Sequence, residues 1–170
     1  MKTFGERMIR AAQLDPALYE EVETDPDAMG QAMSIVVLSS LMMGVGNMGS
    51  FSLVGMLKGV IGSLASWFIW AYLTYVIGTR LLPGPHTRAN YGELLKTIGF
   101  SSSPGILMVF GIIPGLSGIV YIVISVWMLA AMVVAVRQAL DYRSNLRSLS
   151  VCIVGWFVKM VFYQALGILF

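Results

Sequence analysis

The sequence is poor in the residues that enzymes use for chemistry. Lys, Arg, Asp and Glu make up only 12% of its 170 residues, and it has one cysteine and one histidine. A single cysteine excludes an intrachain disulfide, and a single histidine provides no multi-histidine zinc site. Serine nucleophile elbows, paired acids within an apolar segment and phosphate-binding glycine loops are also missing. We therefore expect no enzymatic activity, no cofactor and no metal.

What the sequence has in excess is apolar surface. It is 57% hydrophobic, with a mean hydropathy of +0.79. A soluble domain of this length cannot bury so much apolar surface. The net charge is only +2 and the basic residues are dispersed, which excludes nucleic acid as a partner. A membrane-spanning helix needs about 20 residues, so the composition predicts an all-α transmembrane bundle of about five spans.

The hydrophobic pattern divides the membrane part, residues 28–170, into five segments. The predicted spans are residues 28–46, 53–77, 97–113, 116–136 and 149–170. Between the second and third we expect a connecting loop, residues 78–96, because it holds prolines and several cations. The third span is weak, because Ser101, Ser102, Ser103 and Pro104 interrupt it. The alternative for this span is a re-entrant hairpin.

Residues 1–27 form a more polar N-terminal segment. Its first 13 residues have apolar side chains at helical spacing, which predicts a short amphipathic helix. That helix could lie on the membrane surface or pack on the cytoplasmic ends of the bundle. Asp15-Pro16 and Asp25-Pro26 each predict a helix start. The acidic residues from Asp15 to Asp27 could attract a basic partner or a divalent cation, but they lack calcium-loop spacing, which favours a solvated face.

The cations indicate an orientation. They precede the first span and lie between spans two and three and between spans four and five, whereas residues 46–52 and 114–115 contain none. Basic loops stay in the cytoplasm. The pattern predicts a multi-pass protein of the cell inner membrane with a cytoplasmic N-terminus and an external C-terminus.

Two stretches and the segment that follows them resemble the Yip1 domain family of multispan membrane proteins. The stretches are RAAQLDPALYEEVETDPDAMGQAMSIVVLSSL and GELLKTIGFSSSPGILMVFGIIPG. The resemblance covers nearly the whole chain and implies five spans with the termini on opposite sides. Eukaryotic members are associated with vesicle trafficking and bind prenylated small GTPases. This sequence lacks their long N-terminal region and is similar to the short bacterial branch, so GTPase binding is not carried over.

Lys159 is the residue hardest to explain by packing. It follows Leu149 by ten residues, about 15 Å at 1.5 Å per residue, which places it near the bilayer centre. Because every acidic residue lies outside the spans, the best acceptors are the hydroxyls of residues 101–103 and the Phe100 carbonyl, which loses its helical donor to Pro104. We predict a contact with this broken segment. A lipid phosphate, another subunit, Gln164, or snorkelling to the surface are alternatives.

A stripe of small residues marks the second span. Gly55, Gly59 and Ser63 recur every four residues, a spacing that lets two helices approach closely. Their partner is another span of the same chain or, in a homo-oligomer, a second copy.

Together these features predict a non-enzymatic membrane protein that acts through interactions, in a scaffold or membrane-organising role. Its partners would be membrane lipids and a membrane or cytoplasmic protein. The inference rests partly on family analogy. The alternative is a small-solute, ion or lipid transporter with a midplane site near Lys159 and Pro104. A wet cavity would favour transport, and a dry, tightly packed bundle would favour the scaffold.

Overall fold

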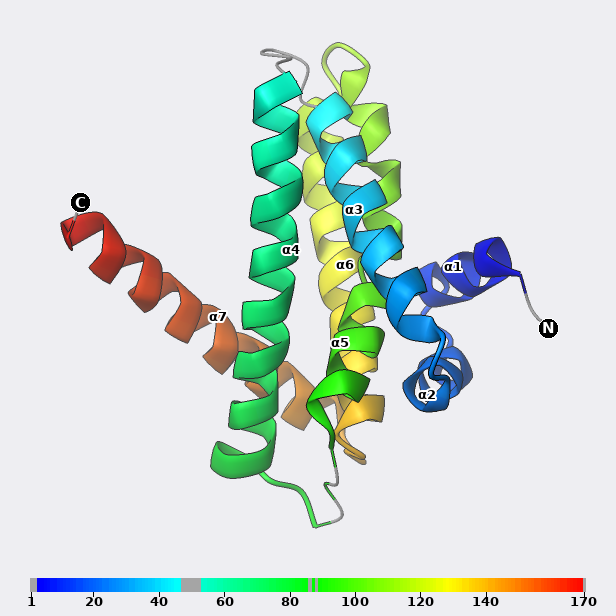
Figure 1. Ribbon diagram of the computed structural model, residues 1–170, viewed down its shortest axis with the longest axis vertical. Helices are drawn as coiled ribbons and strands as arrows, with labels where there is room; N and C mark the ends of the chain where they lie inside the picture. Colours follow the sequence, from blue (N-terminus) through cyan, green and yellow to red (C-terminus); the bar gives the residue numbers. More distant parts are fainter. Residues whose placement is uncertain (1–2, 47–52, 86, 88, 170) are drawn as a thin grey trace.

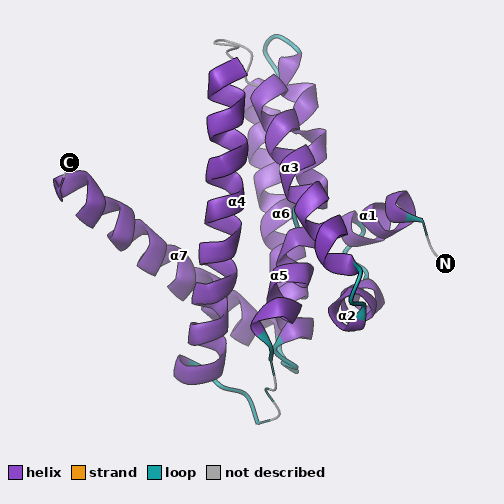
Figure 2. Cartoon of the chain, viewed as in Figure 1, coloured by secondary structure: helices purple, strands orange, loops and turns teal. Residues whose placement is uncertain are grey.

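The computed structural model describes residues 3–46, 53–85, 87 and 89–169, and the side chains of residues 53, 159 and 161–169 fall outside this description. All regular structure in the described residues is helical (Figure 2). The elements are α1 (Phe4–Ala12), α2 (Pro16–Thr24), α3 (Ala28–Gly46), α4 (Leu53–Val76), the π-helical η2 (Ile77–Leu81), α5 (Tyr91–Phe100), the 3-10 helix η3 (Ser103–Ile112), α6 (Ser117–Ala139) and α7 (Asn145–Leu169).

The membrane bundle consists of long apolar helices that run alternately up and down (Figure 1). Within the described residues, four segments are long and apolar enough to cross a bilayer: Ala28–Gly46, Val54–Leu81, Tyr91–Ile112 and Ser117–Ala139. The fifth predicted span corresponds to α7, which is described as an apolar helix over Asn145–Val158 and leaves the bundle obliquely. The predicted all-α membrane bundle is confirmed.

The loop before the third span is shorter than we predicted. Residues 78–96 were expected to connect two spans, but η2 extends the second span to Leu81 and α5 begins at Tyr91. A capping box starts α5: the Asn90 side chain accepts from the Gly92 backbone N–H at 3.0 Å, and Glu93 accepts from the Asn90 N–H at 2.8 Å. These bonds satisfy N–H groups that a helix start otherwise leaves open.

The links at one end of the bundle are bonded to one another. The Tyr142 hydroxyl, in the link after α6, donates to the Leu82 carbonyl at 2.6 Å. Thr87, in the loop after η2, donates its hydroxyl proton to the Leu140 carbonyl at 3.1 Å. The segments that carry the cations therefore lie at the same end of the bundle, as Figure 1 also shows.

The N-terminal helices pack on the side of the bundle. Trp127 of α6 donates its indole N–H to the Ala12 carbonyl at 2.7 Å, and the buried Tyr19 of α2 donates its hydroxyl to the Ala11 carbonyl at 3.2 Å. α1 packs on the bundle and turns Ile9 outward, while its position relative to the membrane surface stays a prediction. The helix start at Asp15-Pro16 is confirmed, whereas α3 begins at Ala28, two residues after the second predicted proline.

Two arginines of α1 neutralise much of the acidic segment. Arg7 contacts Glu21 at 3.1 Å and Asp25 at 2.7 Å, and Arg10 contacts Asp15 and Glu21 at 2.7 Å each. The hydrogen bond from Arg10 holds the pKa of Asp15 below its ordinary value. The pKa of Asp25 is also lowered, first by the Asp27 backbone N–H and then by Arg7. These three carboxylates are bound within the chain, so the expected solvated face is only part of the segment.

Glu23 differs from these acids because no cation fully offsets its burial. It is half-buried at the end of α2, and its pKa is raised to about 7, first by desolvation and then by the charges of Glu93 and Asp141. Lys96 donates to the backbone carbonyls of Glu23 and Asp25 and so ties α2 to α5, but its charge lowers this pKa only in part. An ionised Glu23 carboxylate therefore destabilises the folded state near neutral pH.

Glycines bring α3 close to the third span. A Cβ atom at Gly99 would lie 2.7 Å from the Cβ of Ala32, and one at Gly105 would lie 3.1 Å from the Cβ of Ser39. At the C-terminal end of α3, a Cβ atom at Gly46 would overlap the backbone carbonyl of Met108 in η3. Because small residues let helix backbones approach in a membrane, this seam fixes α3 against α5 and η3.

Substituting Gly99→Ala tests the seam. The new methyl group meets backbone and Cβ atoms of Ala32 that cannot rotate away, so we expect a loss of about 1–3 kcal/mol of unfolding free energy in detergent. Gly62→Ala is the matched control, because nothing lies within 4 Å of its Cβ position. Equal stability of the two variants would show that the close approach does not support the fold.

Glu23→Gln tests the cost of the half-buried carboxylate. Its pKa is raised from an ordinary 4.5 to about 7, so the folded state holds the extra proton between these values. This group's destabilisation is absent below about pH 4.5, grows as pH rises, and is complete above about pH 7. We expect the variant to be more stable than the parent by about 1 kcal/mol at pH 8, a figure discounted for solvent screening, and similar at pH 4.5. Thermal unfolding in detergent, with the exposed Asp27→Asn as control, checks this; a pH-independent difference would contradict it.

Candidate functional site

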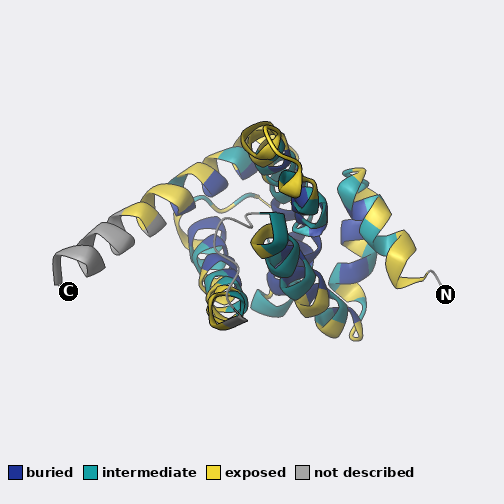
Figure 3. Ribbon diagram, turned by 90° about the horizontal axis from the view of Figure 1, so that it is seen from above, coloured by how far each residue is buried: buried dark blue, intermediate teal, exposed yellow. Residues whose placement is uncertain are grey.

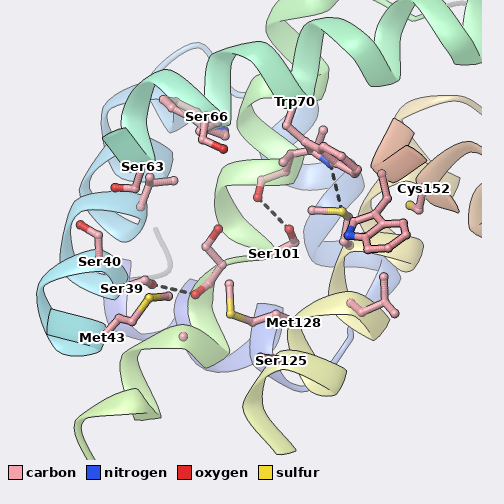
Figure 4. Close-up of a pocket in the computed structure, with 18 of the residues that line it drawn as sticks. Ser39, Ser40, Met43, Ser63, Ser66, Trp70, Ser101, Ser125, Met128 and Cys152 are labelled. Atoms are coloured by element: carbon pink, nitrogen blue, oxygen red, sulfur yellow. Dashed lines mark hydrogen bonds between the residues drawn. The ribbon is translucent and has the colours of Figure 1, made fainter. Parts of the chain in front are cut away.

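A cavity of about 790 Å³ lies inside the membrane-spanning part of the bundle (Figure 4). Side chains of all five apolar segments line it. Its described lining includes seven serines: Ser39, Ser40, Ser63, Ser66, Ser101, Ser102 and Ser125. Four methionines and three tryptophans also line it: Met43, Met108, Met128, Met132, Trp67, Trp70 and Trp156. None of the described lining residues carries a charge.

Each long helix presents one face to the cavity. Lining residues follow one another at intervals of three and four, the spacing of neighbours on a single helix face. They are Val36, Ser39, Ser40 and Met43 on α3, Ser63, Ser66, Trp67 and Trp70 on α4, and Tyr121, Ser125, Met128, Leu129 and Met132 on α6. The cavity serines of these otherwise apolar helices thus lie on the protein-facing side, whereas Ser34 of α3 is exposed.

The break in the third span forms the polar wall of the cavity. The Ser101 hydroxyl donates to the Ile98 carbonyl at 2.7 Å, and the Ser39 hydroxyl of α3 donates to the Ser102 carbonyl at 2.7 Å (Figure 4). The Phe100 carbonyl, expected to be open because of Pro104, accepts from the Ser103 hydroxyl at 2.7 Å. Hydroxyl groups therefore replace backbone donors where the α-helix changes to 3-10 geometry.

Four of the serines that line the cavity, Ser39, Ser40, Ser63 and Ser101, donate their hydroxyl protons to carbonyls of the protein. Ser40 and Ser63 donate their protons to carbonyls of their own helices, those of Val37 at 2.8 Å and Val60 at 3.0 Å. The indole N–H of Trp70 donates to the sulfur of Met132 at 3.1 Å. A serine that has donated its proton can still accept a bond. The described polar lining therefore offers mainly acceptors.

The cavity is open toward the side from which α7 departs. Tyr121 of α6 and Trp156 and Phe157 of α7 line it but keep 59%, 56% and 55% exposed. Seen along the bundle, buried residues concentrate among the packed helices, whereas exposed residues follow one another on the described part of α7 where it leaves the bundle (Figure 3). In a membrane this open side faces lipid.

The structure brings some of the predicted site residues together. Ser101, Ser102 and Ser63 line the cavity, while Ser103 and Pro104 are buried behind it. The predicted contact of Lys159 stays a prediction, because its side chain, like that of Gln164, lies outside the described residues.

The rest of the predicted stripe on α4 faces away from the chain. Gly55 and Gly59 are exposed, and no described atom lies within 4 Å of a Cβ position at Gly59. The partner of this stripe stays a prediction. The close glycine approaches among the described residues use other glycines, including those of the α3 seam.

Sequence reasoning missed four of the cavity serines, Ser39, Ser40, Ser66 and Ser125. The available signal was weak: Ser63 and Ser66 are three residues apart, but Ser39 and Ser40 are adjacent and Ser125 is eight residues from Ser117. It could not show that these faces meet, because that depends on the packing angles.

Comparison with known proteins gives one match. The model of the Yip1 domain matches residues 14–167, nearly the whole chain. No curated protein and no solved structure gives a significant match. The length of the match, the all-helical architecture and the apolar spans all agree with this family. The chain therefore belongs to the Yip1 domain family of membrane proteins.

Proposed function

We propose that this protein binds a membrane lipid in the serine-lined cavity and acts, without catalysis, in organising the membrane around it. The observation that carries the proposal is a cavity of about 790 Å³ that opens sideways from the bundle. Sites for small molecules have volumes of about 300–1,000 Å³ and mostly apolar linings with a few polar groups. This cavity has both properties.

The lining also suits a flexible apolar chain. Met43, Met108, Met128 and Met132 surround the cavity. Unbranched thioether side chains adapt to irregular apolar shapes. A ligand that arrives from the bilayer need not cross water, and the exposed rings of Tyr121, Trp156 and Phe157 border its path of entry.

Transport is the second candidate function. Its support is that the interrupted third span, with Ser101, Ser102 and Gly105, lines the cavity. Interrupted spans that line midplane cavities are common in transporters. Transport would also require access from both sides of the membrane and, in the form predicted from the sequence, a role for Lys159.

The proposed site is in the cell inner membrane, with the N-terminal segment in the cytoplasm. The links that carry arginine and lysine lie at the same end as α2, and basic links stay on the cytoplasmic side. A cytoplasmic protein partner would meet this end of the bundle.

Ser63→Trp tests lipid binding. The side chain lines the cavity from α4, so an indole there occupies space that the lipid needs. We expect about tenfold less lipid bound per protein, measured by native mass spectrometry after extraction in mild detergent. Ser34→Trp is the control. Ser34 is an exposed residue of α3 and, like Ser63, donates its hydroxyl to a carbonyl of its own helix, that of Gly30 at 2.8 Å.

Two outcomes would contradict this function. Lipid retained equally by both variants would place binding outside the cavity. Solute flux in reconstituted vesicles that disappears in Lys159→Ala would favour transport instead.

A reporter fused after Phe170 tests the orientation. An odd number of spans places the two termini on opposite sides of the membrane. We therefore expect periplasmic activity from this fusion and cytoplasmic activity from one at the N-terminus. Cytoplasmic activity from both would mean that α7 does not cross.

A further inference from the structure

The polar groups of the cavity indicate which lipids it takes. Resting on the proposed lipid-binding function, we propose that the cavity selects an uncharged lipid alcohol, such as a diacylglycerol, whose hydroxyl donates a hydrogen bond to the serine oxygens. Lipids with a phosphate and lipids with a capped hydroxyl are discriminated against.

The first step of the argument is where the serine protons go. Ser40, Ser63 and Ser101 donate within their own helices at 2.8, 3.0 and 2.7 Å. Ser39 donates to the Ser102 carbonyl of the neighbouring segment at 2.7 Å. With the protons engaged, each oxygen can accept a bond but gives none to a ligand. A ligand therefore gains by bringing a donor.

The second step is the placement of these oxygens. Figure 4 shows Ser39 and Ser40 of α3 and Ser63 and Ser66 of α4 on neighbouring faces, with Ser101 of the broken span close by and Trp70 and Met128 further round the cavity. These serines thus gather on one side of a mostly apolar space, whereas Ser125 of α6 lies near Met128. A lipid with one donor at the end of apolar chains matches this division.

The third step is charge. No described lining residue is charged, so a phosphate would lose its hydration without meeting a cation. The oxygens of Ser39, Ser40, Ser63 and Ser101, whose protons are already donated, would also face it. Burying an unpaired charge costs far more than burying a neutral hydroxyl that finds an acceptor. An ammonium ligand meets acceptors but no counter-charge, which is also unfavourable inside a membrane.

Indole fluorescence gives a direct test on the full-length protein in nanodiscs. Three tryptophans line the cavity, Trp67, Trp70 and Trp156, so lipids with brominated chains that enter it quench their emission. The probes are a brominated diacylglycerol, the same lipid with its hydroxyl acetylated, and the corresponding phosphatidic acid. Each is added at low mole fraction to phosphatidylcholine.

We expect the diacylglycerol to bind about tenfold more tightly than the acetylated lipid, the value of one good hydrogen bond. Phosphatidic acid should bind more weakly still. The combined variant Ser40→Ala, Ser63→Ala, Ser101→Ala should bind the free and acetylated lipids equally. The matched variant Ser34→Ala, Ser150→Ala should keep the preference, because both are exposed serines with the same intrahelical bonds, at 2.8 and 2.9 Å.

The possible outcomes distinguish the proposed lipid selectivity from the lipid-binding function on which it rests. Quenching by all three lipids with equal affinity would overturn the selectivity and leave lipid binding intact. No saturable quenching by any of them, together with no lipid retained in native mass spectrometry, would overturn both. If the triple variant does not fold, Ser63→Ala alone should reduce the preference, and an unchanged preference in this variant would count against the proposal.

Discussion

The structure depends on one constraint of the bilayer: a polar group within it must find its partner inside the protein. The break at Pro104 shows how this chain meets the constraint. A proline there removes a backbone donor, and the hydroxyls of Ser39, Ser101 and Ser103 bond to carbonyls at the break at 2.7 Å each. The same bonds that make an interrupted span tolerable turn serine oxygens toward a common space. The polarity of the cavity is thus a consequence of how the third span crosses the membrane.

Where the chain meets water, charge replaces hydroxyl groups as the means of satisfying polar atoms. Arg7 and Arg10 bind carboxylates of α2 and the following turn at 2.7–3.1 Å. Partly solvated pairs of this kind contribute little each, so the buried Tyr19 and the bond from Trp127 to α1 are also needed to hold the N-terminal helices on the bundle. Glu23 feels the charges of Glu93 and Asp141, which Lys96 offsets only in part, and this explains its distinct response to pH.

Sequence reasoning found the elements better than their contacts. Long apolar runs predicted the spans, and the positions of the cations predicted which connecting segments lie at the same end of the bundle. Both predictions depend only on where residue types lie along the chain. The start of α5 was missed although Asn90 and Glu93 form a capping box. The stripe at Gly55 and Gly59 was noticed, yet close approaches among the described residues use other glycines, Gly99 and Gly105 among them. Many small residues occur in membrane helices, and their spacing alone does not say which of them meets a neighbour.

The cavity has one fixed wall and one loose wall. On the fixed side Gly105 both lines the cavity and packs against Ser39, so α3 and η3 cannot approach further or separate without losing the glycine seam. On the loose side Trp156 and Phe157 border the same space while more than half exposed, on a helix that leaves the bundle. Close-packed interfaces resist deformation, whereas exposed side chains change rotamer readily. A ligand larger or smaller than the observed space would therefore be accommodated by movement of α7, while the serine oxygens of α3 and the broken span keep their positions.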